Sequence, residues 1–288
     1  MKSICYYVAA VAILFATSGC QKDSEDTLSV GDKKIEFKTS IVKENPISGN
    51  IKKPVMNDDG SGNFSNGDVF TLHVLSESGK STNIKYSVGI TNLYWKDINL
   101  NSEDHQVHFS ACYPEQELSD GKFSFDMETA PVKDLLWAHN KGVSTETSEP
   151  VELQFKHIMH RLVINYSTES DIEVDQIKTV CTAKSTCEID LAGETIDNSN
   201  AQKADFPATG KQISFMLVPQ KVSDVKLHVV VGKLEKDFNL NEYVKSDNLE
   251  SGMQLTVNLK VKDGSIVLEG NSIDPWGDQG TIEGEIIM

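Results

Sequence analysis

Met253-Gln-Leu-Thr-Val-Asn-Leu-Lys-Val261 alternates apolar and polar side chains along its whole length. Successive side chains of a β-strand point to opposite faces of the sheet, so residues 255, 257, 259 and 261 share one apolar face. Residues 256, 258 and 260 share a polar face that water can cover. A strand with one dry and one wet face is typical of an antiparallel sandwich, so this stretch predicts that fold class.

The same alternation recurs along most of the chain, in short runs separated by turn residues. The runs are Ile35–Ile41, Val69–Leu75, Ile84–Val88, Leu93–Trp95, Val107–Tyr113, Lys122–Phe125, Val151–Tyr166, Ile177–Thr182, Thr186–Leu191, Ile213–Val218, Val225–Val231 and Ile266–Leu268. Helical periodicity is nearly absent, and only 236–248 could hold a short helix. This spacing of strands predicts an all-β protein of antiparallel β-sandwiches rather than a βαβ arrangement.

A polar stretch, Glu146-Thr-Ser-Glu-Pro150, precedes the long run Val151–Tyr166 and is the best candidate for a domain boundary. We therefore expect an N-terminal sandwich over residues 35–149 and a C-terminal sandwich over 150–288, both of ordinary domain size. Within the second domain, the runs on either side of residues 183–185 suggest a hairpin.

The N-terminus has the order of a secretory signal that ends at a cysteine. Lys2 is followed by a mostly apolar, uncharged run to Thr17, and then by Ser18, Gly19 and Cys20. Cleavage would leave residues 1–19 as the signal peptide and Cys20 as a lipidated N-terminus, with 20–34 as a flexible tether. The alternatives are an ordinary signal with an incidental cysteine, or an uncleaved anchor. The lipoprotein interpretation predicts a surface-exposed location at the cell outer membrane.

The composition excludes some functions. A formal net charge of −16 over 288 residues argues against nucleic acid, which requires a basic face. Cys181 and Cys187 could face each other across a hairpin as a disulfide, or they could be free thiols together with Cys112. There is no CxxC, GxSxG, HExxH or phosphate-binding glycine loop, so we expect no catalytic residues, metal or cofactor.

Two groups of side chains are candidates for a metal or ligand site. His157 and His160 are three residues apart, and on a strand this spacing points them to opposite faces, so we expect packed histidines rather than a metal pair. Tyr94, Trp95 and Trp137 could line a sugar-binding surface, although aromatic residues in sandwiches more often lie in the core.

The order of several motifs resembles the fimbrillin family, the surface lipoproteins and pilus subunits of anaerobic host-associated bacteria. After the lipoprotein signal and the strand Ile35–Ile41, these motifs are Gly67-Asp68, Asp134-Leu-Leu-Trp-Ala138, Val151–Asn165, Cys187-Glu-Ile-Asp-Leu-Ala-Gly193, Gly252–Leu259 and Ile273-Asp-Pro-Trp276. The resemblance implies two tandem transthyretin-like β-sandwiches. It also implies assembly by strand exchange, in which a protease removes the first strand and a strand of the next subunit fills the gap.

On this resemblance, Ile35–Ile41 is the removable strand, and Ile282, Ile286 and Met288 lie on one face of a candidate donor strand. The alternative is that both are ordinary edge strands. Family stalk subunits are typically cut after Arg or Lys in the loop behind the first strand, where this chain offers Lys43 and Lys52.

The only arginine of the chain is Arg161, far from that loop, which favours an uncut anchor or accessory subunit that keeps its lipid. We therefore expect a non-enzymatic structural or adhesive subunit of a pilus (fimbrium). Its partners would be other pilus subunits, the outer membrane through the lipid, and a host glycan or protein. The alternative is a monomeric surface lipoprotein that binds a glycan or host protein.

Overall fold

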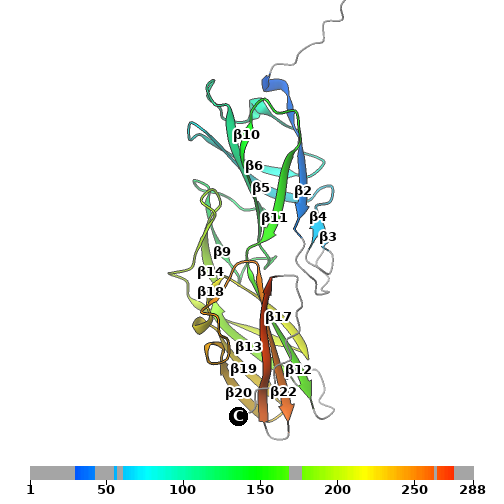
Figure 1. The fold of residues 1–288 in the computed structure, drawn as a ribbon, viewed down its shortest axis with the longest axis vertical. Helices are drawn as coiled ribbons and strands as arrows, with labels where there is room; N and C mark the ends of the chain where they lie inside the picture. The colour runs from blue at the N-terminus through cyan, green and yellow to red at the C-terminus, as the bar shows by residue number, and fades with distance from the viewer. Residues whose placement is uncertain (1–29, 43–54, 57–60, 169–176, 263–264, 276–288) are drawn as a thin grey trace, which may run out of the picture.

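A computed structural model of the chain describes residues 30–42, 55–56, 61–168, 177–262 and 265–275. These residues form two β-lobes stacked along one long axis, as Figure 1 shows. Within these ranges there is no α-helix, only short 3₁₀ turns, which confirms the all-β fold class. No helix among them is long and apolar enough to cross a membrane.

The first lobe contains an eight-stranded sheet that bends into two layers. Its order is β3 (Val55–Met56), β4 (Gly62–Asn63), β2 (Phe37–Ile41), β11 (Val151–His157), β10 (Leu136–Ser144), β8 (Gln106–Tyr113), β5 (Val69–Ser76) and β6 (Ser81–Ser87). β10 and β11 pair only at their ends, through Leu136 with His157 and Trp137 with Lys156. Beyond that corner the strands diverge, so β2 and β11 pack over β5, β6 and β8. A small pair, β1 (Lys34–Ile35) and β7 (Leu93–Tyr94), closes one side.

Aromatic rings fill the space between these two layers. The Phe37 ring of β2 meets Tyr86 and Phe109 edge-on, at centroid distances of 5.0 and 5.4 Å. The Phe155 ring of β11 lies 5.3 Å from Phe70 of β5. These contacts between rings from the two layers make the first lobe a sandwich with its own apolar core.

The second lobe packs two four-stranded sheets face to face. One has the order β17 (Gln212–Leu217), β12 (His160–Thr168), β22 (Met253–Lys262) and β23 (Ser265–Pro275). The other has the order β16 (Lys203–Thr209), β13 (Ile177–Lys184), β19 (Lys226–Val231) and β20 (Leu234–Asn239). A further pair joins β18 (Gln220–Lys221) to β21 (Asn248–Leu249). The apolar face of Met253–Val261 is buried in the core between the sheets, as its alternation predicts.

Three expectations about single elements are wrong: one long strand, one short helix and one hairpin. Val151–Tyr166 is not one strand, because β11 belongs to the first lobe and β12 to the second, with Ile158 and Met159 between them. The division between the lobes therefore lies at residues 158–159 rather than at 149–150. Leu240–Glu242 forms a 3₁₀ turn (η5) after β20 where a short helix was considered. Most strand pairs are antiparallel, as the sequence predicts, and the two parallel pairs are β2 with β11 and β12 with β22 among the described strands.

The third wrong expectation is the hairpin after Ile177. β13 pairs with β16 and β19, whereas β14 (Thr186–Asp190) pairs with β15 (Thr195–Asp197) and with β9 (Lys122–Asp126) of the first half of the chain. Cys181 and Cys187 consequently lie in different cores and are free thiols, so the suggested disulfide is absent.

Candidate functional site

The first strand is held mainly from one side. All five residues of β2 run parallel to β11, from Phe37 opposite Val151 to Ile41 opposite Phe155. Towards β4, the part of the chain that the structure describes contains one pair, Ile41 with Gly62. Main-chain bonds continue the ladder at both ends, where Val151 N donates to Glu36 O at 2.7 Å and Val42 N donates to Phe155 O at 2.8 Å.

The side chains of this segment explain why it binds there. Ile35 and Ile41 are buried in the first-lobe core, and Phe37 packs between them against the opposite layer. On the outer face, Lys38 Nζ lies 2.8 Å from Glu152 Oε1 of β11, in an exposed ion pair. The segment thus places alternate apolar side chains in the core, while its backbone pairs mainly with β11 and makes single pairs to β4 and, through Ile35, to β7. A strand held mostly by one neighbour and by alternate side chains has the geometry used in strand addition.

Several predicted site residues lie outside the described residues. These are Cys20, the processing candidates Lys43 and Lys52, and the donor-strand residues Ile282, Ile286 and Met288. Arg161, by contrast, lies in β12 with only 8% of its surface exposed. A protease that needs an accessible arginine therefore has no substrate at this position in the folded chain.

The two lobes are joined by a small third core, the junction core. β9 comes from the first half of the chain, yet it forms a three-stranded sheet with β14 and β15, and Cys187 lies opposite Phe125 in this pairing. Beneath it lie Ile158 and Met159 of the segment between the lobes, and Leu135 before β10. Figure 1 shows β9 and β14 between the two lobes, where this sheet braces them.

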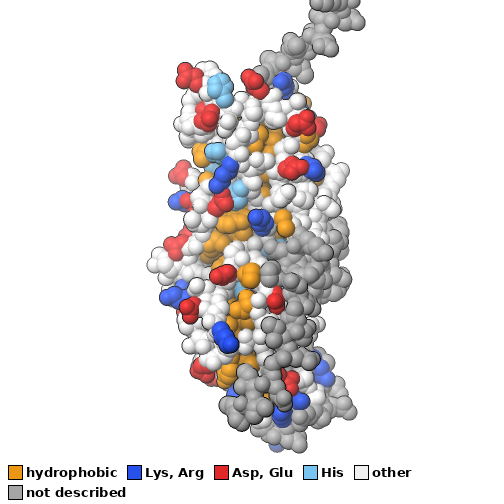
Figure 2. Space-filling model, in the orientation of Figure 1, with side chains coloured by type: hydrophobic (Ala, Val, Ile, Leu, Met, Phe, Trp, Pro, Cys, Tyr) orange, Lys and Arg blue, Asp and Glu red, His pale blue; other side chains and the backbone are white. Residues whose placement is uncertain are grey.

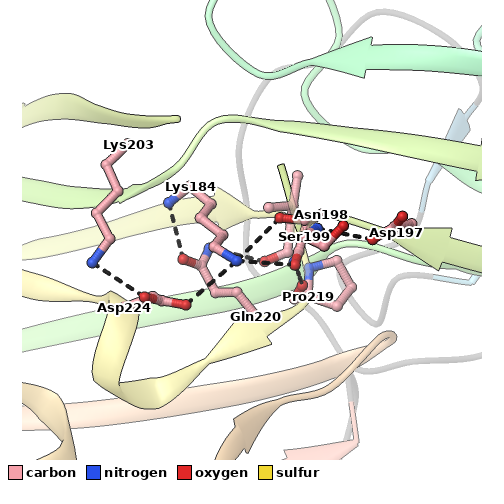
Figure 3. Close-up of polar contacts among 9 residues, drawn as sticks. Lys184, Asp197, Asn198, Ser199, Lys203, Pro219, Gln220 and Asp224 are labelled. Carbon is pink, nitrogen blue, oxygen red and sulfur yellow. Dashed lines mark hydrogen bonds and ion pairs between the residues drawn. The ribbon is translucent and has the colours of Figure 1, made fainter. Parts of the chain in front are cut away.

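A polar cluster fixes the end of the β15 hairpin to the second lobe, as drawn in Figure 3. Lys184 Nζ donates to the backbone oxygen and to Oδ1 of Asn198, at 3.0 and 3.2 Å, and lies 3.6 Å from Asp224 Oδ2. Asn198 Nδ2 in turn donates to the carbonyl of Pro219. Because Lys184 is mostly buried, these partners replace the water that its ammonium group loses, and the cluster acts as a structural clamp.

Both candidate metal-ligating histidines have hydrogen-bonding partners within the protein. His157 Nδ1 lies 2.7 Å from Asp134 Oδ2 in a buried pair, and His160 Nδ1 lies 2.9 Å from the Glu250 carbonyl oxygen. His157 lies in β11 of the first lobe and His160 in β12 of the second. Burial lowers the pKa of His160 to about 4, so this imidazole is neutral at physiological pH.

The three thiols lie in cores. Burial raises the pKa of Cys112 and of Cys187 to about 12, and it also raises the pKa of Cys181. Thiols of this kind are poor nucleophiles and poor metal ligands, since both roles require the thiolate.

The three aromatic residues considered for a sugar-binding surface differ in their surroundings. Trp95 is only 2% exposed and belongs to the first-lobe core, so it is not available to a ligand. Trp137 instead lines a hollow of about 470 Å³ between the diverging strands β10 and β11. Tyr94 lies beside Lys96 and is absent from the lining of this hollow.

A scan against protein families matches the fimbrillin-like family over residues 56–276. The chain belongs to this family. Family membership implies a fimbrial, cell-surface location and supports a structural protein. No curated protein matches the chain.

Two solved structures share the fold. A candidate cell adhesion protein from Bacteroides ovatus superposes with a TM-score of 0.60 at 17% identity, covering 85% of this chain and 98% of its own. One from Bacteroides uniformis gives a TM-score of 0.56 at 14% identity, covering 74% and 93%. At these identities the likeness extends to the fold alone.

Proposed function

We propose that this fimbrillin-like chain is a non-enzymatic subunit of a cell-surface pilus, assembled by exchange of its first strand. The observation that carries this proposal is the unequal pairing of β2 among the described residues, with five parallel pairs to β11 and a single pair to β4. Removing residues 35–41 would expose both the β11 edge and the core positions of Ile35, Phe37 and Ile41. An incoming strand with alternating apolar residues would satisfy both.

The proposed donor is the C-terminal segment 282–288, whose residues Ile282, Ile286 and Met288 repeat that alternation. Its route to a neighbouring subunit would start after β23, the last of the described strands. The proposed anchor is a lipid on Cys20, which would hold the subunit at the outer membrane. Proteolysis after Lys43 or Lys52 would release both the lipid and the first strand, whereas an uncut chain would remain as an anchor or accessory subunit.

The decisive experiment is mass spectrometry of the protein isolated from the cell surface, combined with electrophoresis of unheated samples. A stalk subunit would begin just after Lys43 or Lys52 and run as a ladder of SDS-resistant multimers. An anchor subunit would begin at lipidated Cys20 and appear at the end of such multimers. A protein that begins at Cys20 and runs only as a monomer would refute the pilus role.

The alternative function is a monomeric surface lipoprotein that binds a host glycan or protein. Its specific support is the hollow beside Trp137, because this aromatic ring, unlike that of Trp95, borders an open space.

A further inference from the structure

The hollow at the corner of the first lobe has the lining of a binding site. β10 contributes 137–141, β11 contributes Glu152, Gln154 and Lys156, and the turn between β14 and β15 contributes Glu194. Its volume of about 470 Å³ lies within the usual range of small-molecule clefts, roughly 300–1,000 Å³. Figure 2 shows this face, where basic, acidic and histidine side chains border a hydrophobic area over β10 and β11.

Trp137 supplies the apolar surface of this hollow and is held in a fixed position. Its indole is half-buried against the junction core, and the His139 ring meets it edge-on at a centroid distance of 5.2 Å. His139 is itself held by Ser110, whose Oγ lies 3.1 Å from Nδ1. A rigid aromatic face that binds without further ordering is a favourable stacking platform.

Hydrogen-bonding groups surround this face. Asn140 donates its Nδ2 to the Glu152 carbonyl at 3.0 Å, which orients the amide, and the exposed amide of Gln154 follows on β11. Lys141 and Glu194 form an ion pair of 2.5 Å that joins the turn between β14 and β15 to β10. Amides and carboxylates together offer both donors and acceptors to a ligand rich in hydroxyl groups.

The charges of the lining cancel, which bears on the class of ligand. Lys141 and Lys156 are balanced by Glu152 and Glu194. Burial lowers the pKa of His139, which keeps this ring neutral at physiological pH. Lys38, which pairs with Glu152 from β2, adds one positive charge at the edge, so the site carries at most one net positive charge. The chain as a whole carries −16, so long-range repulsion of an anionic ligand outweighs this small local excess. The larger hollow near Lys122 differs in this respect, because its lining is mainly acidic.

We propose that the hollow between β10 and β11 binds a neutral sugar ring, stacked on Trp137 and held through its hydroxyl groups by Asn140, Gln154 and Glu152. The C–H face of a pyranose is apolar and fits an aromatic side chain, while its rim carries neutral hydroxyl groups. This proposal deepens the alternative function given above, glycan binding at the cell surface, and rests on it, because it names the class of sugar and the residues that hold it.

The test is ligand-observed saturation-transfer NMR on the purified chain with cellobiose, lactose, maltose and N,N′-diacetylchitobiose, and with 3′-sialyllactose as an anionic probe. We expect signal from at least one neutral disaccharide, little change between 50 and 500 mM salt, and a weaker signal from the anionic sugar. Trp137→Ala should weaken binding about tenfold, as the loss of one stacking contact predicts.

Two further variants separate loss of the site from loss of the fold. Trp137→Phe keeps an aromatic platform and most of the packing, so it should bind within about threefold of the unmodified chain. Tyr94→Ala removes a surface aromatic side chain outside the hollow and should bind normally. Absence of signal from all four neutral sugars would overturn the proposal, as would unchanged binding by Trp137→Ala. Because the measurement uses the isolated chain, it is independent of multimer formation, so a chain that binds sugar without polymerising would refute strand exchange alone.

Discussion

Ile41→Ala tests whether the first strand stabilises the first lobe as strongly as its contacts indicate. Ile41 is 4% exposed, packs in the first-lobe core and lies opposite Phe155 at the end of β2. Replacing a buried isoleucine by alanine usually costs about 2–5 kcal/mol. The neighbour on the other side is Gly62, which has no side chain to support the cavity walls, so partial collapse should keep the cost near 2–3 kcal/mol.

Lys38→Ala is the matched control on the same strand. Its ion pair with Glu152 is well exposed, at 73% and 53% for the two side chains, so water screens it and its loss should leave the free energy of unfolding nearly unchanged. Urea unfolding followed by tryptophan fluorescence measures both variants, because Trp95 lies in the same core as Ile41. With a slope near 2 kcal/mol per molar urea, Ile41→Ala should lower the midpoint by roughly 1 M.

Two results would refute this reasoning. A cost below about 1 kcal/mol for Ile41→Ala would mean that β2 does not secure the first lobe. Equal costs for both variants would mean that the strand is held by its surface rather than by its apolar side chains.

Three other outcomes follow from buried groups. His160→Gln should flatten the pH dependence of stability, because the folded pKa of His160, about 4, lies below its unfolded value near 6.5. As pH falls through that window, the unmodified chain should lose up to about 3 kcal/mol of unfolding free energy relative to the variant. Denaturant titrations at several pH values would measure this difference. Native Cys112, Cys181 and Cys187 should resist iodoacetamide at pH 8 and react after unfolding, as peptide mapping would report. Phe125→Ala should cost about 3–4 kcal/mol and split one calorimetric transition into two, since it weakens the core that joins the lobes.

The positions of strands could be predicted from sequence because alternation is a local property. In β22 the residues expected on the apolar face are buried, and the intervening residues are more exposed, except that Gln254 near the strand start is also buried. The same local information identified β5, β8, β13 and β19 at close to their observed bounds. Alternation indicates which face of a strand is buried, and several strands with one buried face are sufficient to predict a sandwich.

Pairing partners could not be predicted, because alternation does not identify the neighbouring strand. β9 and β14 are about sixty positions apart, and nothing in either run indicates that they meet. The position at which the chain crosses from the first lobe to the second could not be predicted for a related reason. Ile158 and Met159 are apolar because the third core buries them, so the usual polar signal of a turn is absent at this crossing. The polar stretch 146–150 is instead a loop that leads from β10 back into β11 of the same lobe.

The candidate site was predicted in part. The segment 35–41 stays a prediction as the exchangeable strand, drawn from the family resemblance, whereas its break at Glu36 and its parallel pairing with β11 are visible only in the structure. Trp95 and Trp137 look alike in sequence, since each stands in a short apolar run. Only the fold separates them, because Trp95 faces the first-lobe core while Trp137 faces the corner where two strands diverge.

The division of the chain into three cores gives strand exchange a physical basis. Ile35 and Ile41 are buried in the first-lobe core, and Phe37 packs against it, whereas neither the junction core nor the second-lobe core contains a residue of β2. Loss of the first strand would therefore weaken one core and leave the other two intact. The second lobe and the brace formed by β9 and β14 would keep the subunit folded and hold the opened groove in a fixed orientation. An incoming strand would then restore a single core, which requires far less ordering than folding a whole subunit.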